Sequence, residues 1–331
     1  MSGARENACW VGFDLGGTKM LATVFDAEFQ PVARKRRKTR GREGAAPALE
    51  RVADTIRLTL EAAGVRPSQL GGIGVGCPGP LDLEAGIVLE APNLGWINAP
   101  LKELLEAEFE CPAVILNDVD AGVYGEYRFG AGKGARCLVG VFPGTGIGGG
   151  CVYDDRILRG RNRSCMEIGH VQVMPEGPLC GCGKRGCLEA VASRLAISAA
   201  AAQAAFRGQA PNLLKAAGTS LSDIRSGTLA SAIAAGDDVV EKIVRGAARQ
   251  IGVAVGGVIH LLGPDVVVLG GGLVEAMPQI YLETVTSAAR EWVLPSLADS
   301  FRIEAAQLGD DAAVIGAAAW AREMVSKTKQ R

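Results

Sequence analysis

An α/β protein with two lobes or two domains is the fold that three features of the sequence predict. Short apolar runs of strand length alternate with helical patterns along the 331 residues, which is typical of an α/β architecture. A strand, a glycine turn and a second strand occur near the N-terminus, and the same arrangement returns close to residue 140, which indicates an internal duplication. The chain is too long for one small core, and 48% of it is hydrophobic.

The first half begins with a predicted strand meander in which a glycine turn joins the first two strands. The helix that follows has apolar residues at spacings of three and four, which place one stripe against a sheet, and Gly64 ends it. Asn117 and Asp118 lie at the carboxyl end of the last predicted strand of this half. The predicted strands cover 10–13, 20–25, 31–38, 73–77 and 113–116, and the predicted helices cover 49–63, 101–109 and 118–128.

The second half repeats the order of strand, Gly-Thr turn and strand, and then becomes largely helical. Residues 136–142 form the predicted strand, 143–150 the turn, and the return strand begins at Cys151. The remaining predicted elements are an alanine-rich helix at 190–205, a helix at 239–262, a strand at 265–269, one more helix, a strand near 301–305 and a final helix from Asp311.

The charge balance gives no indication of a nucleic-acid or membrane partner, because the formal net charge is −1. No apolar stretch approaches the roughly 18–20 residues that span a bilayer, and the N-terminus lacks the layout of a signal peptide. A cytoplasmic location is therefore the default expectation. The basic run at 34–42 is interpreted either as a contact for nucleic acid or another polyanion such as polyphosphate, or as a solvated edge strand whose charges discourage aggregation.

The turn that joins the first two strands is a candidate phosphate-binding segment. Gly16 and Gly17 let backbone N–H groups point inward together, and Thr18 adds a hydroxyl; such a turn can cradle a phosphate. Asp14 at the strand end suits a Mg²⁺ ion held through water, and Lys19 adds positive charge. The alternative is a plain hairpin turn, since glycine turns are common.

Two further glycine-rich turns are candidates for the same ligand. Gly144-Thr145-Gly146, with Gly148–Gly150 after it, would grip a triphosphate from the second lobe while the first turn holds it from the other. Neither the first turn, at 14–19, nor this second turn matches the phosphate loop G-x-x-x-x-G-K-[ST]. Gly270-Gly271-Gly272 follows a predicted strand and either lets an adenine lie on bare backbone or only starts a helix.

A cluster of cysteines and one of the two histidines predicts a zinc site. His170, Cys180, Cys182 and Cys187 follow the pattern H-x9-C-x-C-x4-C, and three thiolates with one imidazole complete a tetrahedral zinc set. Four protein ligands leave no open position, so the ion is expected to be structural. The other six cysteines mostly lie in apolar runs and are interpreted as buried small hydrophobic residues, and His260 as a core or surface histidine.

Three carboxylates are candidates for substrate chemistry. Asp118 at a strand end is where ligands of open α/β sheets bind, and it would accept a proton as a general base or cap the following helix. Glu167 and Glu189 flank the cysteine cluster. If zinc holds that loop in place, both carboxylates are natural acceptors for sugar hydroxyls, and the alternative for each is an ordinary surface position.

Together these motifs resemble the ROK family of sugar kinases and repressors, in particular its glucokinases, from about residue 10 to about residue 321. The motifs are Asp14-Leu-Gly-Gly-Thr-Lys19, Pro92-Asn-Leu-Gly-Trp96, Leu116-Asn-Asp118, Gly144-Thr-Gly-Ile-Gly148, Glu167-Ile-Gly-His170 and Cys180-Gly-Cys-Gly-Lys-Arg-Gly-Cys-Leu-Glu189. The two most specific motifs are the last two, which contain the four residues of the predicted zinc site.

The resemblance implies a two-lobed, actin-like ATPase-domain (ribonuclease H-like) fold with a ligand cleft between the lobes. The smaller lobe would comprise 1–117 and be completed by the C-terminal helix at about 308–331, and the larger lobe would comprise 118–307 with the zinc loop. The first two glycine turns would hold the phosphates of ATP, and Gly271 and Gly272 would lie near the adenosine. The family also implies a homodimer.

The resemblance further implies that Asp118 deprotonates the sugar hydroxyl. The residues that would contact the sugar are Asn93, Asn117, Asp118, Glu167, His170 and Glu189. His170 would serve twice, with one ring nitrogen on zinc and the other toward a sugar hydroxyl, since the metal locks the ring's orientation. The protein would mainly position the reactants and neutralise charge, and closure of the lobes would exclude water.

The function that follows is an ATP-dependent hexose kinase of the glucokinase type. The alternatives are a kinase for mannose, fructose, allose or N-acetylmannosamine, polyphosphate as the donor, or a sugar-sensing regulator without catalysis. The family's repressors carry a helix-turn-helix before the first glycine turn, and 13 residues precede Asp14 here. The chain departs from the family pattern at Ser193-Arg-Leu-Ala196, where Ser-Gly is usual, and at Asp120, where a small or amide residue is usual.

Overall fold

The computed structural model describes residues 8–40, 44–91, 94–161 and 165–330, which fall into two compact units. The first unit comprises 1–134, 157–165 and 310–331, and the second comprises 135–156 and 166–309. The first unit extends past the expected boundary at residue 117, because the helix that begins at Asp118 packs on the C-terminal helix of the same unit.

The first unit is built on a sheet with the strand order β3-β2-β1-β4-β8. β1 (Cys9–Leu15), β2 (Lys19–Phe25) and β3 (Pro31–Lys38) form the predicted antiparallel meander. β4 (Leu70–Cys77) pairs parallel with β1, and β8 (Ala113–Asn117) pairs parallel with β4. The basic run therefore lies mainly on an edge strand, as one of its two interpretations predicts.

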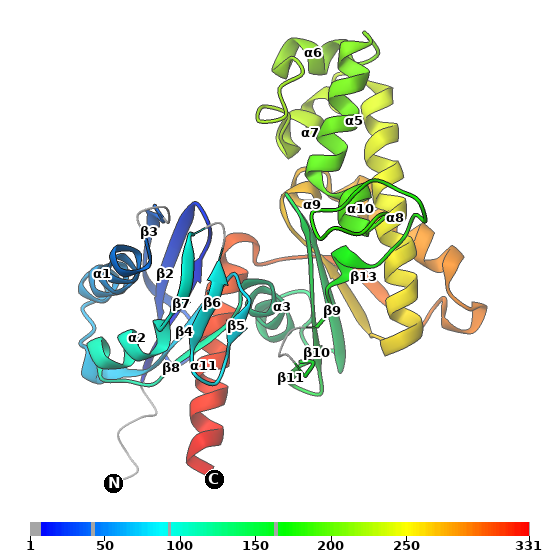
Figure 1. The fold of residues 1–331 in the computed structure, drawn as a ribbon. Helices are drawn as coiled ribbons and strands as arrows, with labels where there is room; N and C mark the ends of the chain where they lie inside the picture. The colour runs from blue at the N-terminus through cyan, green and yellow to red at the C-terminus, as the bar shows by residue number, and fades with distance from the viewer. Residues whose placement is uncertain (1–7, 41–43, 92–93, 162–164, 331) are drawn as a thin grey trace. The chain divides into compact units, whose positions relative to one another are not determined.

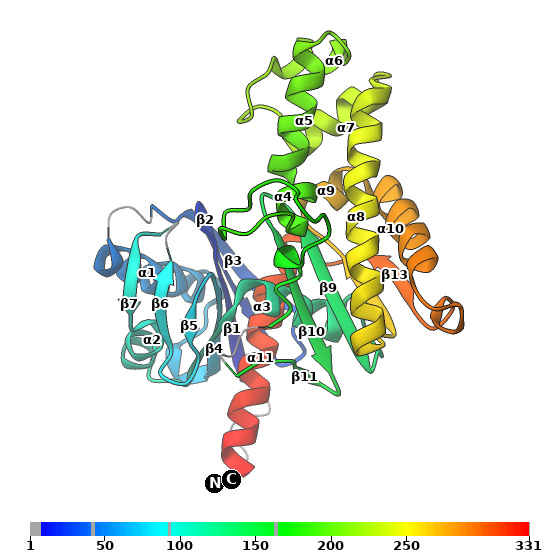
Figure 2. The same cartoon turned by 45° about the vertical axis from the view of Figure 1, so that its right-hand side comes forward.

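Helices cover both faces of this sheet (Figure 1). α1 (Ala45–Ala63) packs its apolar stripe on one face and ends at Gly64 in the left-handed conformation. α11 (Ala312–Gln330), drawn in red in Figures 1 and 2, packs on β1 and β4 and against α3 (Asp118–Phe129). A Cβ at Gly12 would lie 1.8 Å from the Val314 carbonyl oxygen, and one at Gly74 would lie 1.9 Å from that of Ala317, so glycine is required for this close approach.

A small antiparallel sheet in the first unit was not expected from the sequence. It consists of β5 (Leu81–Asp82), β6 (Ile87–Ala91) and β7 (Trp96–Ala99), in the order β5-β6-β7. These strands have two to five residues each, which is too short for a period to be recognised. They lead into α2 (Leu101–Phe109), which forms where it was predicted.

The second unit repeats the topology of the first. Its sheet has the order β11-β10-β9-β12-β13; β9 and β10 are antiparallel, and β12 pairs parallel with both β9 and β13. This is the pairing of β1, β2, β4 and β8, so the internal duplication extends to the whole sheet. The strands are β9 (Cys137–Pro143), β10 (Ile147–Tyr153), β11 (Arg156–Ile157), β12 (Val266–Leu269) and β13 (Arg302–Ala305).

The helices of the second unit differ from the prediction in one respect. The alanine-rich helix expected over 190–205 is two helices, α4 (Leu188–Ala192) and α5 (Arg194–Phe206), because Ser193 is extended and caps α5 by accepting from the Ala196 N–H. Figure 2 shows α5, α6 and α7 grouped at one end of the unit. The other helices are α6 (Pro211–Ala217), α7 (Ser226–Ala234), α8 (Asp238–Leu262), α9 (Gly272–Ala276) and α10 (Pro278–Trp292).

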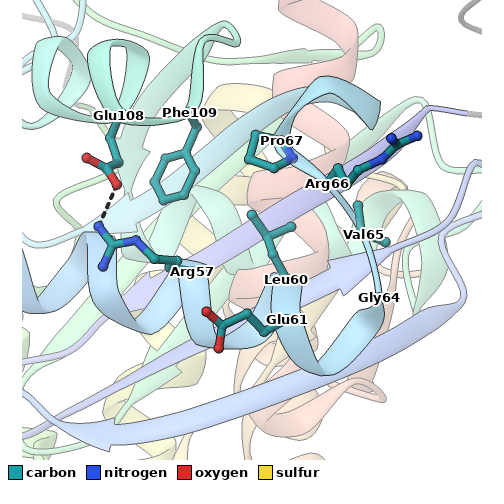
Figure 3. A pocket seen from close by; sticks show the side chains of 9 residues that line it. All are labelled: Arg57, Leu60, Glu61, Gly64, Val65, Arg66, Pro67, Glu108 and Phe109. Carbon is teal, nitrogen blue, oxygen red and sulfur yellow. Dashed lines mark hydrogen bonds and ion pairs between the residues drawn. The ribbon is translucent and has the colours of Figure 1, made fainter.

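A pocket of about 330 Å³ lies between α1 and α2 (Figure 3). Its walls include Leu60 and Phe109, and Arg57 on its rim is paired with Glu108. Pro67, also in the wall, precedes β4 closely, so the pocket lies toward the amino ends of the parallel strands. Asp14 and Asp118 lie toward the carboxyl ends, so this pocket is separate from the candidate site described below.

The cysteines outside the cluster are mostly buried, as expected. Cys77, Cys111, Cys137 and Cys151 are buried, whereas Cys9 and Cys165 are half-buried. Within the described residues, no helix is both long and apolar enough to cross a bilayer.

Candidate functional site

Asp14 and Asp118 lie at the same edge of the first sheet. The register aligns Asp14 with Gly76 and Gly76 with Leu116 across three parallel strands, so the carboxyl ends of β1 and β8 meet at this edge. A Cβ at Gly76 would lie 3.5 Å from the Asp118 Cα atom. Asp14 and Asp118 therefore form a pair of carboxylates where open α/β sheets bind ligands.

Both carboxyl groups are harder to ionise than ordinary aspartates. Burial, and then the charges of Asp118 and Asp310, raise the pKa of Asp14 to about 7, against an opposing effect of Arg36. Burial also raises the pKa of Asp118, although hydrogen bonds from backbone and side chain oppose this. A cation or a proton at this edge would therefore be bound favourably.

Asn117, not Asp118, caps the helix that starts here. The Asn117 Oδ1 atom accepts from the N–H groups of Val119 (2.9 Å) and Asp120 (3.2 Å). Asp118 is the first residue of α3, and its Oδ1 accepts from the Val119 N–H at 2.9 Å. Asn117 is therefore the N-cap of α3, which was the alternative role considered for Asp118.

The first glycine turn is held from behind by Thr39. The Thr39 hydroxyl donates to the Gly16 carbonyl oxygen at 2.7 Å, and the Thr39 N–H donates to that of Thr18 at 2.9 Å. Thr39 is fully buried, whereas Gly17, Thr18 and Lys19 are exposed. The N–H groups of Gly17 and Thr18 have no acceptor among the described residues, so the turn offers free donors of the kind that bind phosphate.

The second glycine turn is shorter than the predicted 143–150, because β10 already begins at Ile147. Glu189 holds one end: its Oε2 atom accepts from the Ile147 N–H at 2.9 Å and would lie 2.4 Å from a Cβ at Gly146. Arg194 holds the other end, donating from its backbone N–H to the Gly144 carbonyl oxygen at 2.8 Å and from Nη2 to Thr145 Oγ1 at 2.9 Å.

The third glycine turn, Gly270–Gly272, lies against the second within the same unit. It follows β12 and opens α9, as the sequence predicts. Gly271 has φ 81°, and a Cβ there would lie 2.9 Å from the Pro143 carbonyl oxygen. Both features require glycine, and they bring Gly271 next to the beginning of the second turn.

His170, Cys180, Cys182 and Cys187 come together in the second unit. Their candidate ligand atoms all lie within 4.8 Å of one another. Cys182 Sγ is 3.7 Å from Cys187 Sγ, and Cys180 Sγ is 3.7 Å from His170 Nδ1. Zn–S bonds of about 2.3 Å in a tetrahedron place two sulfur atoms about 3.8 Å apart, so the spacing of these side chains fits a zinc ion.

The loop between these ligands is folded tightly by its glycines. The Gly183 N–H donates to the Cys180 carbonyl oxygen at 2.9 Å, and the Cys180 N–H donates to that of Lys184 at 2.8 Å. Gly186 has φ 72°, and a Cβ there would lie 1.7 Å from the Met174 carbonyl oxygen. The backbone thus brings the thiols together, and Glu189 follows two residues after the last of them.

The remaining residues predicted to contact the sugar are Glu167, His170 and Asn93. Glu167 precedes the short turn η3 (Ile168–His170) and His170 ends it, and both residues are exposed. In that turn, a Cβ at Gly169 would lie 2.2 Å from the Ile147 carbonyl oxygen. Both flanks of the cysteine cluster therefore contact Ile147 at the end of the second glycine turn. Asn93 lies outside the described residues.

Thr39 and Arg194 are contacts of the glycine turns that sequence reasoning missed. Neither belongs to a recognisable motif, because Thr39 follows β3 and Arg194 begins α5, each well away in sequence from the turn that it contacts. The departure from Ser-Gly at Ser193-Arg194 was the one signal available for Arg194. His260 is exposed, and its Nε2 accepts from the Leu294 N–H.

The duplicated sheets, each with a glycine turn between its first two strands, define an actin-like ATPase fold. Comparison with known proteins agrees with this class. A crystal structure of a ROK family glucokinase from Streptomyces griseus in complex with glucose and AMPPNP is similar with a TM-score of 0.80 and 32% identity, covering 96% of this chain and 100% of that one.

The ROK family model matches residues 10–324. A glucokinase from Halalkalibacterium halodurans is 34% identical over 313 residues, which is 93% of each chain. A xylose repressor from Caldicellulosiruptor bescii is 28% identical, over 80% of this chain and 65% of that protein. The chain therefore belongs to the ROK family, and its similarity to the glucokinases extends over nearly all of both chains, which places it among the family's sugar kinases.

Proposed function

We propose that this protein is an ATP-dependent glucokinase that forms glucose 6-phosphate, with Asp118 as the general base. The observation that carries the proposal is the pair of carboxylates, Asp14 and Asp118, at the carboxyl edge of the first sheet next to a glycine turn with free N–H donors. The similarity to glucokinases over more than nine-tenths of the chain supports the same activity.

Asp118 would take the proton from the 6-hydroxyl of the sugar. As the sugar oxygen forms its bond to the γ-phosphorus, the bond from that phosphorus to the bridging oxygen of ADP breaks, and the hydroxyl proton passes to the Asp118 carboxylate. Because burial raises the pKa of Asp118, the carboxylate is a stronger base than an exposed aspartate. The cost is that the base is lost by protonation at a higher pH than an ordinary aspartate would be.

The donor would be held by the glycine turns. Gly16, Gly17 and Thr18 with Lys19, and Gly144, Thr145 and Gly146, would bind the phosphates, and Gly271 and Gly272 would lie near the adenosine. The crystal structure of the relative from Streptomyces griseus contains AMPPNP, which supports a nucleoside triphosphate as the donor. Asp14 would hold Mg²⁺ through water, and the bound ion would neutralise phosphate charge during transfer.

The sugar hydroxyls would be bound by Asn93, Asn117, Glu167, His170 and Glu189 in addition to Asp118. Glu189 uses Oε2 for the Ile147 N–H, so Oε1 is the oxygen proposed for the sugar. Zinc bound by His170 and the three cysteines would have a structural role, fixing the segments that carry Glu167 and Glu189.

The test is a coupled ADP-release assay with Mg-ATP across glucose, mannose, fructose, allose and N-acetylmannosamine, repeated with polyphosphate as donor. Preference for glucose with ATP is the expected result. Preference for another sugar would overturn the substrate assignment and keep the kinase, whereas turnover with polyphosphate alone would overturn the donor.

A sugar-sensing regulator is the second candidate, since a xylose repressor matches much of the chain. Folded, zinc-bearing protein that binds glucose and releases no ADP would support it. We also propose that the two units correspond to the smaller and larger lobes of the family and that the protein is a homodimer; light scattering after size exclusion tests the dimer, and a monomer at micromolar concentration would contradict it.

A further inference from the structure

We infer that Arg194 is an additional phosphate-binding residue, which contacts the terminal phosphates of the donor from the second glycine turn. The inference rests on the proposed function, because it takes Gly144-Thr145-Gly146 as a phosphate turn. Arg194 lies in the stretch Ser193-Arg-Leu-Ala196, where the chain departs from the pattern that the resemblance implies, so the inference concerns a residue particular to this chain.

The position of the guanidinium is set by two contacts with the turn. The backbone N–H of Arg194 donates to the Gly144 carbonyl oxygen at 2.8 Å, which fixes the first residue of α5 against the turn. The side chain then reaches Thr145, where Nη2 donates to Oγ1 at 2.9 Å. A cation is thus held at the tip of the turn on which the phosphates are proposed to lie.

Most of the donor capacity of Arg194 remains for a ligand. A guanidinium has five N–H donors in a fixed fork, and within the described part of the chain Thr145 is the side chain that receives one of them. Arg194 is half-buried and Thr145 is exposed. The remaining donors are in a position to bind phosphate oxygens in the bidentate manner that favours arginine over lysine.

The backbone of the turn supplies donors beside this cation. The Gly144 N–H is used within the turn, on the Gly146 carbonyl oxygen at 2.8 Å, whereas the N–H groups of Thr145 and Gly146 have no acceptor among the residues that the structure describes. Glu189, an acidic residue of α4, contacts the other end of the turn, where its Oε2 accepts from the Ile147 N–H. Thr145 therefore carries both a free amide donor and the contact to Arg194.

A purely structural clip is the competing role for Arg194, and it makes a different prediction. A residue that only shapes the turn would affect every ligand of the nucleotide site to a similar extent. A residue that contacts the terminal phosphates would affect ADP and AMPPNP but not AMP or adenosine. The number of phosphates on the ligand is therefore the variable that separates the two roles.

The experiment is isothermal titration of adenosine, AMP, ADP and AMPPNP, with Mg²⁺, into the wild type, Arg194→Ala and Arg194→Lys. Arg207→Ala removes an exposed charge at the other end of the same helix and is the matched control. We expect Arg194→Ala to weaken AMPPNP by about tenfold or more, with AMP and adenosine within about twofold, and Arg194→Lys to be intermediate. Thermal melting of each variant verifies folding.

The outcomes separate this inference from the proposed function. Equal losses across the four ligands, or no loss in Arg194→Ala, would overturn the role of Arg194 while leaving the kinase assignment standing. Wild-type protein that binds AMPPNP but phosphorylates no sugar would overturn the proposed function, and the ligand series would still decide the role of Arg194. Wild-type protein that binds none of the four ligands would overturn both.

Discussion

Replacing Asp14 by asparagine should raise the free energy of unfolding above neutral pH. The same substitution should abolish the additional stability that Mg-ATP gives the wild type. The fold raises the pKa of this carboxyl group from 3.8 to about 7, through burial first and the charges of Asp118 and Asp310 second. A charged Asp14 is therefore disfavoured in the folded state, and asparagine has nearly the same shape without the charge.

The magnitude follows from the two pKa values. Because the folded pKa is the higher one, the contribution of this group to stability is fully present below about pH 3.8 and is lost as the pH rises to about 7. The difference between those values corresponds to about 4 kcal/mol. We expect Asp14→Asn to have a free energy of unfolding about 2–4 kcal/mol above that of the wild type at pH 8, and one similar to it at pH 4.

The assay is thermal and urea unfolding of both proteins from pH 4 to pH 8, with Asp299→Asn, which changes an exposed carboxylate, as the control. The difference between Asp14→Asn and the wild type should grow with pH, whereas that of the control should stay flat. Adding Mg-ATP at pH 8 should stabilise the wild type and not Asp14→Asn. If the free energies of unfolding of the two proteins changed with pH in parallel, the reasoning that the fold destabilises the charged form of Asp14 would be refuted.

Three further substitutions test the zinc cluster, the sugar contacts and the first glycine turn. Cys182→Ser should lose zinc and about 2 kcal/mol or more of stability; full zinc occupancy by metal analysis would contradict the ligand assignment, and Cys165→Ser is the control. Glu167→Gln should raise the KM for sugar by roughly tenfold with little change for ATP, and the reverse pattern in steady-state kinetics would place it elsewhere. Thr39→Val leaves the Gly16 carbonyl oxygen unpaired and should cost about 1–3 kcal/mol and weaken AMPPNP binding. Thr59→Val, which removes a buried hydroxyl bonded within α1, should lose stability alone, so equal AMPPNP affinity in both threonine variants would count against the role of Thr39.

The elements with strong periodicity were predictable from the sequence. The apolar runs at β1, β2, β4 and β8 are largely buried, and α8 has the apolar stripe that its spacing predicts. The small sheet β5-β6-β7 was missed because Ile97 and Leu89 are exposed on short strands, which removes the alternation that identifies a strand. The break between α4 and α5 was hidden in an alanine-rich stretch, where Ser193 as a helix cap was the available signal.

Some features of the candidate site were likewise predictable from the sequence, and others were not. The cysteine cluster is local in sequence, so its spacing was enough to predict that four side chains meet. The contacts of Thr39 with Gly16 and of Arg194 with Thr145 join segments 23 and 49 residues apart. No local pattern encodes such contacts, because they depend on how strands and helices pack. The N-cap of α3 could not be assigned from the sequence either. Asn117 caps the helix if it begins at Asp118, and Asp118 would cap it if it began one residue later.

The most direct test of the account is the turnover of Asp118→Asn with glucose and Mg-ATP, measured together with glucose binding by calorimetry. The account predicts that the variant binds glucose with an affinity close to that of the wild type but loses ADP release by about a hundredfold or more, because no base accepts the hydroxyl proton. A variant that releases ADP at the wild-type rate would contradict the role of Asp118 and the mechanism built on it.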